Sequence, residues 1–114
     1  MRTPEETALL IVLLFKRSGQ RRARISVVTL RRLSTRRHIR SAFLGKVEES
    51  LDDLGLILVE LERGGYGLLP LSALDGAPAI TAKRYLQDEQ GVAIDFEAIR
   101  KEIGQEWSLD ADEE

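Results

Sequence analysis

Residues 26–70, SVVTLRRLSTRRHIRSAFLGKVEESLDDLGLILVELERGGYGLLP, decide the fold. Ser26 is a typical helix cap, and the apolar residues Val27, Val28, Leu30 and Leu33 that follow it predict a short helix. Ser34 and Thr35 offer a second cap, which precedes apolar side chains at spacings of four, four, four and three residues. The sequence therefore predicts a turn and then a longer helix at residues 36–54, closed by Gly55. Its inward stripe consists of Ile39, Phe43, Val47, Leu51 and Leu54.

After Gly55 the apolar period changes from that of a helix to that of a strand. Ile57, Val59 and Leu61 alternate with other residues, which predicts a strand with these three side chains on its buried face. The dipeptide Gly64-Gly65 suits a two-residue hairpin turn, because such turns need positive backbone torsions. This turn predicts a register in which Arg63 opposes Tyr66, Leu61 opposes Leu68 and Val59 opposes Pro70.

Before Ser26 the sequence predicts one helix and a short extended piece. Thr3-Pro4-Glu5-Glu6 combines a hydroxyl cap, a proline at the first helical position and an acid three residues after the cap. Residues 8–15 are apolar on every side, so we expect a core helix that other elements surround. Gly19 ends this helix, and residues 23–25 form the extended piece.

The net charge of −2 hides a strong separation of charge along the 114 residues. Residues 1–47 carry 12 Lys or Arg against two acids, residues 48–74 carry one against six, and residues 75–114 carry four against eleven. Between Thr7 and Val47 there is no acid at all. The sequence favours binding to an anionic polymer. The alternative is a solvated basic face that the acidic tail balances.

The order helix, extended piece, helix, turn, helix, hairpin resembles a winged helix-turn-helix domain. The resemblance covers residues 3–71 and depends on the cap residues, the Ser34-Thr35 turn before a long helix, and the Gly-Gly hairpin. It implies an α+β, mainly helical fold with a three-helix core and a β-hairpin wing. It also implies that residues 36–46 enter the DNA major groove and that residues 63–66 touch the DNA backbone. The predicted organisation is this domain at residues 1–75, a helical extension at 76–109 and an acidic tail at 110–114.

The charges on the predicted helix 36–54 run against its dipole. Arg36 and Arg37 stand at the amino end and Asp52 and Asp53 at the carboxyl end, whereas helices prefer the reverse order. A phosphate bound at the amino end would account for this order, because free amides and arginines both attract it. Gly45 on the outward face permits a close backbone approach, or else it serves packing.

Each cationic segment has an expected role in binding duplex DNA. Arg37 and Arg40 are candidates for forking onto guanine edges, beside the short and permissive Ser41. The arginines before and on the helix 27–34 are expected to bind phosphates, and Arg63 with Tyr66 is expected to reach a phosphate from the wing tip. The full candidate set is Arg21, Arg22, Arg24, Arg31, Arg32, Arg36, Arg37, His38, Arg40, Ser41, Lys46, Arg63 and Tyr66.

The carboxyl-terminal part predicts two further helices, at residues 80–90 and 95–107, with Asp95 as the cap of the second. One stripe of that helix carries Phe96, Ile99, Ile103 and Trp107. Because two-fold pairing is common among DNA-binding proteins, we expect a homodimer through residues 79–107.

Several classes of protein are disfavoured by the composition. The chain has no cysteine and one histidine, so it offers no thiolate chemistry and little material for a metal site, and no phosphate-binding glycine loop is present. We expect no enzyme activity, no cofactor and no metal. The longest apolar run has eight residues, against roughly 20 for a membrane span. We therefore expect a cytoplasmic protein that does not enter a membrane.

Two other functions are compatible with parts of the sequence. The first is a winged-helix assembly module whose arginines meet an acidic protein partner. The second is RNA binding, which has little support because the chain has only six Phe, Tyr and Trp residues, and most of these fall at apolar-stripe positions rather than on a stacking surface. The leading expectation is sequence-specific binding to double-stranded DNA by a small transcriptional regulator.

Overall fold

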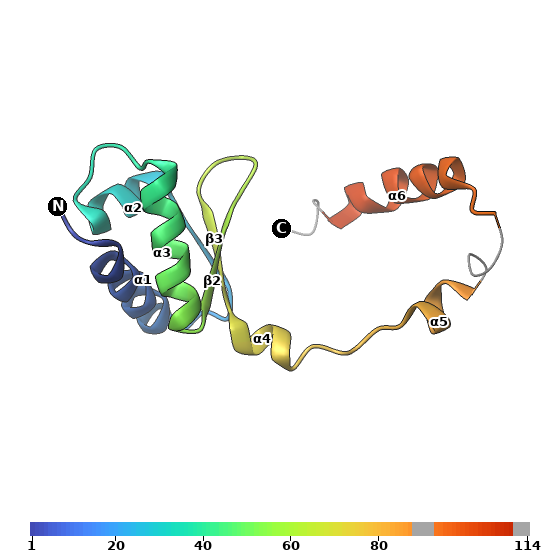
Figure 1. Ribbon diagram of the computed structural model, residues 1–114, viewed down its shortest axis with the longest axis horizontal. Coiled ribbons are helices and arrows are strands. Elements are labelled where there is room, and N and C mark those ends of the chain that lie inside the picture. Colours follow the sequence, from blue (N-terminus) through green and yellow to red (C-terminus); the bar gives the residue numbers. More distant parts are fainter. Residues whose placement is uncertain (88–92, 111–114) are drawn as a thin grey trace. The chain divides into compact units, whose positions relative to one another are not determined.

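The computed structural model describes residues 1–87 and 93–110, the last six of them by their backbone alone. The fold is α+β, with helices and a three-stranded antiparallel sheet of order β1-β3-β2 (Figure 1). The chain divides into two compact units, Met1–Ala77 and Pro78–Glu114. The first unit contains α1 (Pro4–Ser18), β1 (Ala23–Ile25), α2 (Val27–Ser34), α3 (Ser41–Asp53), β2 (Leu56–Glu60), β3 (Tyr66–Pro70) and α4 (Leu71–Asp75).

Helix α1 begins and ends where the sequence predicts. The Thr3 hydroxyl accepts a hydrogen bond from the Glu6 amide at 3.1 Å, and the Glu6 carboxylate accepts one from the Thr3 amide at 2.9 Å. Gly19 adopts a left-handed φ of 70° as the C-cap. The expectation that other elements surround α1 is wrong, because its neighbours cover only one face. Ala8 and Ile11 are fully buried, whereas Leu9, Leu13 and Leu14 remain exposed.

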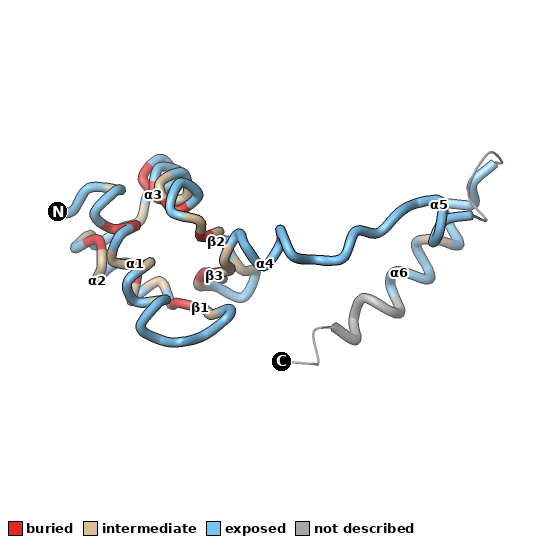
Figure 2. The backbone as a smooth tube through the Cα atoms, turned by 90° about the horizontal axis from the view of Figure 1, so that it is seen from below, coloured by how far each residue is buried: buried red, intermediate tan, exposed pale blue. Residues whose placement is uncertain are grey.

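The core of the first unit lies between the three longer helices and one face of the sheet (Figure 2). Leu30 of α2 and Val47 and Leu51 of α3 are fully buried beside Ile11. The sheet contributes its own apolar face to the same cluster. The predicted cap of α2 is confirmed, because the Ser26 hydroxyl accepts a hydrogen bond from the Thr29 amide at 3.1 Å.

The predicted register of the hairpin and the predicted inward face of β2 are wrong, whereas Leu68 of β3 is buried as predicted. Leu58 pairs with Leu68 and Glu60 with Tyr66, so Leu56 and Leu58 are buried while Val59 is half exposed. The reason is a longer turn at residues 61–65, in which the Leu61 amide donates to the Gly65 carbonyl at 3.1 Å. Five turn residues instead of two shift the pairing by three positions, and an odd shift exchanges the two faces of a strand.

Gly65 is required where the turn passes β1. Its φ is +78°, and a Cβ atom built on it would lie 2.9 Å from the Ile25 carbonyl oxygen. A side chain at this position would meet backbone in a conformation that already disfavours it. The close contact therefore lets the hairpin run beside β1, whose Ile25 pairs with Tyr66.

The second unit contains α5 (Ala82–Tyr85) and α6 (Phe96–Asp110). The predicted helix 80–90 is shorter in its described part, and residues 88–90 and the tail 111–114 lie outside the described residues. The Asp95 carboxylate accepts a hydrogen bond from the Ala98 amide at 3.2 Å, which confirms the predicted cap. Within the described residues, no helix combines the length and the apolarity that a membrane crossing requires.

Candidate nucleic-acid interface

Helix α3 begins at Ser41, five residues later than the sequence predicts. The predicted positions of Arg36, Arg37 and His38 in its first turn are therefore wrong, since all three lie in the loop at residues 35–40. This loop starts at Thr35, whose left-handed φ of 54° ends α2. The physical reason is a set of contacts that hold the chain away from a helical path after α2.

These contacts involve Arg2 and Arg36, which join the amino terminus to the loop. The Arg2 guanidinium donates to the carbonyl oxygens of Arg32 at 3.3 Å and Leu33 at 2.9 Å, and so satisfies the end of α2. The Arg36 guanidinium donates to the Arg2 carbonyl at 3.0 Å and lies 3.8 Å from the centre of the Phe43 ring. Arg36 therefore supports the fold, whereas the sequence predicts it as a DNA contact.

Other polar residues of the loop face solvent. Arg37, His38 and Arg40 are exposed, whereas Ile39 is partly buried against the core. Arg40 is the N-cap residue of α3, and its side chain makes no capping hydrogen bond. By contrast, hydroxyl groups cap both α1 and α2. The amino end of α3 thus combines amides that no side chain caps with an adjacent arginine.

The outward face of α3 changes from small and basic to acidic along its length. Ser41, Ala42 and Lys46 are exposed in its first half, and Glu49, Asp52 and Asp53 in its second. A Cβ atom built on Gly45 would meet nothing within 4 Å, so packing does not explain this glycine. Only the amino half of α3 offers a surface that an anionic polymer would approach.

Of the two residues predicted at the wing tip, only Arg63 lies in the turn. Arg63 is exposed in the turn at residues 61–65, but Tyr66 belongs to β3 and only 7% of it is exposed. The predicted position of Tyr66 at the wing tip is therefore wrong, because the hairpin register differs. Burial raises the pKa of Tyr66 above its ordinary value of 10.0, the nearby Glu60 carboxylate raises it further, and Arg31 opposes this effect.

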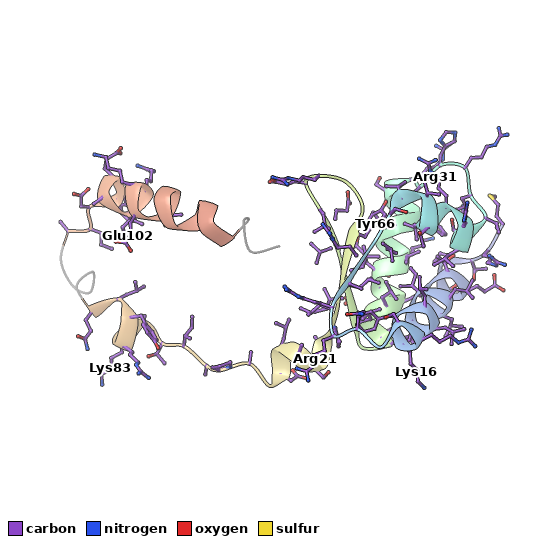
Figure 3. All side chains as sticks on the ribbon, turned by 180° about the vertical axis from the view of Figure 1, so that it is seen from behind. Lys16, Arg21, Arg31, Tyr66, Lys83 and Glu102 are labelled. Carbon is purple, nitrogen blue, oxygen red and sulfur yellow. The ribbon has the colours of Figure 1, made fainter. Side chains whose placement is uncertain are left out.

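The basic residues gather at two ends of the first unit. The loop at residues 35–40, the amino end of α3 and the turn at residues 61–65 lie at the same end, the upper one in Figure 1, with α3 between the loop and the turn. We call this the loop end. Arg31 of α2 lies at the loop end, whereas Lys16 and Arg21 lie at the opposite end (Figure 3). Arg22 follows Arg21 in the connection to β1, and Arg24 is exposed on β1, opposite Gly67.

The cations at the loop end have no acidic partners among the described residues. Over all the residues that the structure describes, the one ion pair joins Arg100 and Glu97 in α6, at 3.3 Å. Arg31 and Arg32 on the last turn of α2 are both exposed. Their charges are therefore available to an external anion.

Residues predicted to form a dimer lie in α6. Phe96 and Ile103 are exposed and Ile99 is partly exposed, while the side chain of Trp107 lies outside the described residues. Across residues 1–87 and the described part of 93–110, no group of three or more acidic or histidine side chains is placed to hold a metal ion.

Comparisons with protein-family models, with curated proteins and with solved structures find no significant match.

Proposed function

We propose that this chain binds double-stranded DNA as a winged helix-turn-helix protein and acts as a small transcriptional regulator. The element order and the β1-β3-β2 sheet are compatible with that arrangement, in which α3 enters the major groove and the turn at residues 61–65 follows the backbone.

The observation that carries the proposal is the composition of the loop end. Arg37, Arg40 and Arg63 are exposed on two separate segments at this end, which lie on either side of the uncapped amino end of α3. Helix amino ends favour phosphate through their free amides and their dipole, and arginine adds a forked, permanently charged donor. A surface of this kind stabilises a bound phosphate chain.

Some of the side chains expected to bind DNA do not fit the proposed surface. The Arg36 guanidinium stacks on the Phe43 ring and donates to the Arg2 carbonyl, and Arg21 lies at the end of the unit opposite the loop end. Neither residue therefore belongs to the proposed surface. The cationic candidates on α2, the loop, α3 and the turn are Arg31, Arg32, Arg37, Arg40, Lys46 and Arg63, and the candidates His38 and Ser41 are exposed beside them. If the six cationic side chains neutralise about six phosphates, the slope of log affinity against log salt is about −5.

The test is binding of the full chain to random duplex DNA across a salt series, followed by selection from a random duplex library. Arg37→Ala and Arg40→Ala should weaken binding and relax the selected sequence. Arg21→Ala is the matched control, because it removes the same charge from the opposite end and should change affinity much less. No duplex binding at low salt, or equal losses in all three variants, would overturn the proposal. Binding to an acidic protein without binding to DNA would instead support an assembly module.

A further inference from the structure

Helix α1 leaves an apolar face without a partner in the first unit. Ala8 and Ile11 point into the core, and Leu9 and Leu13 lie one turn apart on the opposite face, 57% and 39% exposed. A partner that covered Leu9 and Leu13 would remove their apolar area from water, and burial of a leucine side chain is strongly favourable. We call this surface the outer face of α1, and it includes the charged residues that flank the leucines.

The flanking charges are arranged symmetrically about the middle of the helix. Glu5 and Glu6 occupy the first turn and Lys16 and Arg17 the last. Leu9 and Leu13 stand two residues on either side of Ile11, and the charged pairs stand five and six residues on either side. At 100° per residue, Glu5 and Lys16 fall along one edge of the leucine pair, while Glu6 and Arg17 fall along the other. No described ion pair uses any of these four side chains.

We propose that α1 is a self-association surface, which packs antiparallel against α1 of a second copy of this chain. A two-fold axis near Ile11 brings Leu9 against Leu13 of the partner subunit. The same operation brings Glu5 to Lys16 of the partner subunit and Glu6 to Arg17 of the partner subunit. A two-fold interface uses the same patch on both copies, so it requires this kind of self-complementarity.

Charge complementarity favours a second copy over an unrelated partner. Preference for acids at the amino end and cations at the carboxyl end of a helix accounts for the signs of these charges. This preference does not explain the exposed leucines between the charges. Nor does it explain why an acid and a cation fall along each edge of the leucine pair. An antiparallel copy buries the exposed leucines and pairs the flanking charges at once.

The test is sedimentation of the full chain from low to high micromolar concentration. We expect a concentration-dependent dimer whose dissociation constant rises at least tenfold in Leu9→Glu, a substitution at an exposed position. Glu5→Lys and Lys16→Glu should each raise it about tenfold, because each replaces two symmetric attractions by repulsions. The double variant should recover most of the wild-type affinity, since the pair is restored with its signs exchanged. Circular dichroism checks that each variant folds.

Three results would overturn this assignment. One is a monomer at every concentration. Another is a double variant weaker than either single variant, which is the result that helix-dipole effects alone predict. The third is a dimer that persists in Leu9→Glu and dissociates in Ile103→Glu, because that outcome assigns the contact to the exposed stripe of α6.

Discussion

Replacement of Gly45 by alanine separates helix stability from nucleic-acid binding. Gly45 lies inside α3, and a Cβ atom at this position meets nothing within 4 Å. Alanine is favoured over glycine within a helix by about 0.5–1 kcal/mol, so Gly45→Ala should stabilise the first unit by that amount. For a domain of this size the corresponding rise in Tm is about 2–8 °C.

The same substitution should weaken binding to duplex DNA. Gly45 lies on the outward face of α3 beside Ser41, Ala42 and Lys46, where the proposed function requires the groove to approach the helix. An added methyl group in a close contact costs about 1–3 kcal/mol, which is roughly a fivefold to hundredfold loss of affinity.

Two assays decide the outcome for Gly45→Ala, namely thermal unfolding followed by circular dichroism and DNA titration at fixed salt. Gly104→Ala is the matched control, because Gly104 is a helical glycine of α6 whose Cβ also meets nothing within 4 Å. It should leave DNA affinity unchanged. A rise in Tm without loss of DNA affinity would refute close approach at Gly45, and a fall in Tm would refute the open space around it.

Three further predictions concern the fold around the loop end. Gly65→Ala should cost more than the roughly 1–2 kcal/mol of a left-handed side chain, because its Cβ meets a β1 carbonyl oxygen at 2.9 Å. Gly64→Ala should cost only the torsional part, and urea unfolding measures both. Arg36→Ala should lower the free energy of unfolding by about 1–2 kcal/mol through lost stacking and hydrogen bonding, whereas Arg37→Ala should change it by less than about 0.5 kcal/mol. Because the folded state raises the pKa of Tyr66 above 10.0, its stabilising contribution is complete below pH 10 and is lost as pH rises through the raised pKa. Tyr66→Phe should remove this part of the alkaline destabilisation in a pH series of unfolding curves.

Sequence reasoning succeeds where the deciding interactions are local. The start of α1 depends on a hydrogen-bonded exchange between Thr3 and Glu6, and the start of α2 on a bond from the Thr29 amide to Ser26. These pairs are three residues apart, so a residue pattern contains the whole interaction. The same holds for Asp95 at the start of α6.

The start of α3 and the hairpin register depend on contacts between distant residues. Arg2 satisfies the end of α2 from about 30 residues away, and its carbonyl oxygen accepts the hydrogen bond of Arg36, which fixes the loop before Ser41. The turn at residues 61–65 lies against the Ile25 carbonyl, about 40 residues earlier in the chain. A Ser-Thr cap and a Gly-Gly turn are sound local alternatives that these contacts outweigh.

The candidate site also depends on contacts between distant residues, because cations that are close in the sequence need not lie on one surface of the fold. The acid-free stretch between Thr7 and Val47 contains arginines that lie in three different environments in the structure. Arg36 is stacked on Phe43, Arg21 lies at the opposite end, and Arg37 stays exposed in the loop. Net charge over a segment therefore predicts attraction to a polyanion, while the fold selects which cations can act on the same phosphate chain. Since the selection leaves the uncapped end of α3 among exposed arginines, loss of Arg37 should alter DNA binding and loss of Arg36 should alter stability first.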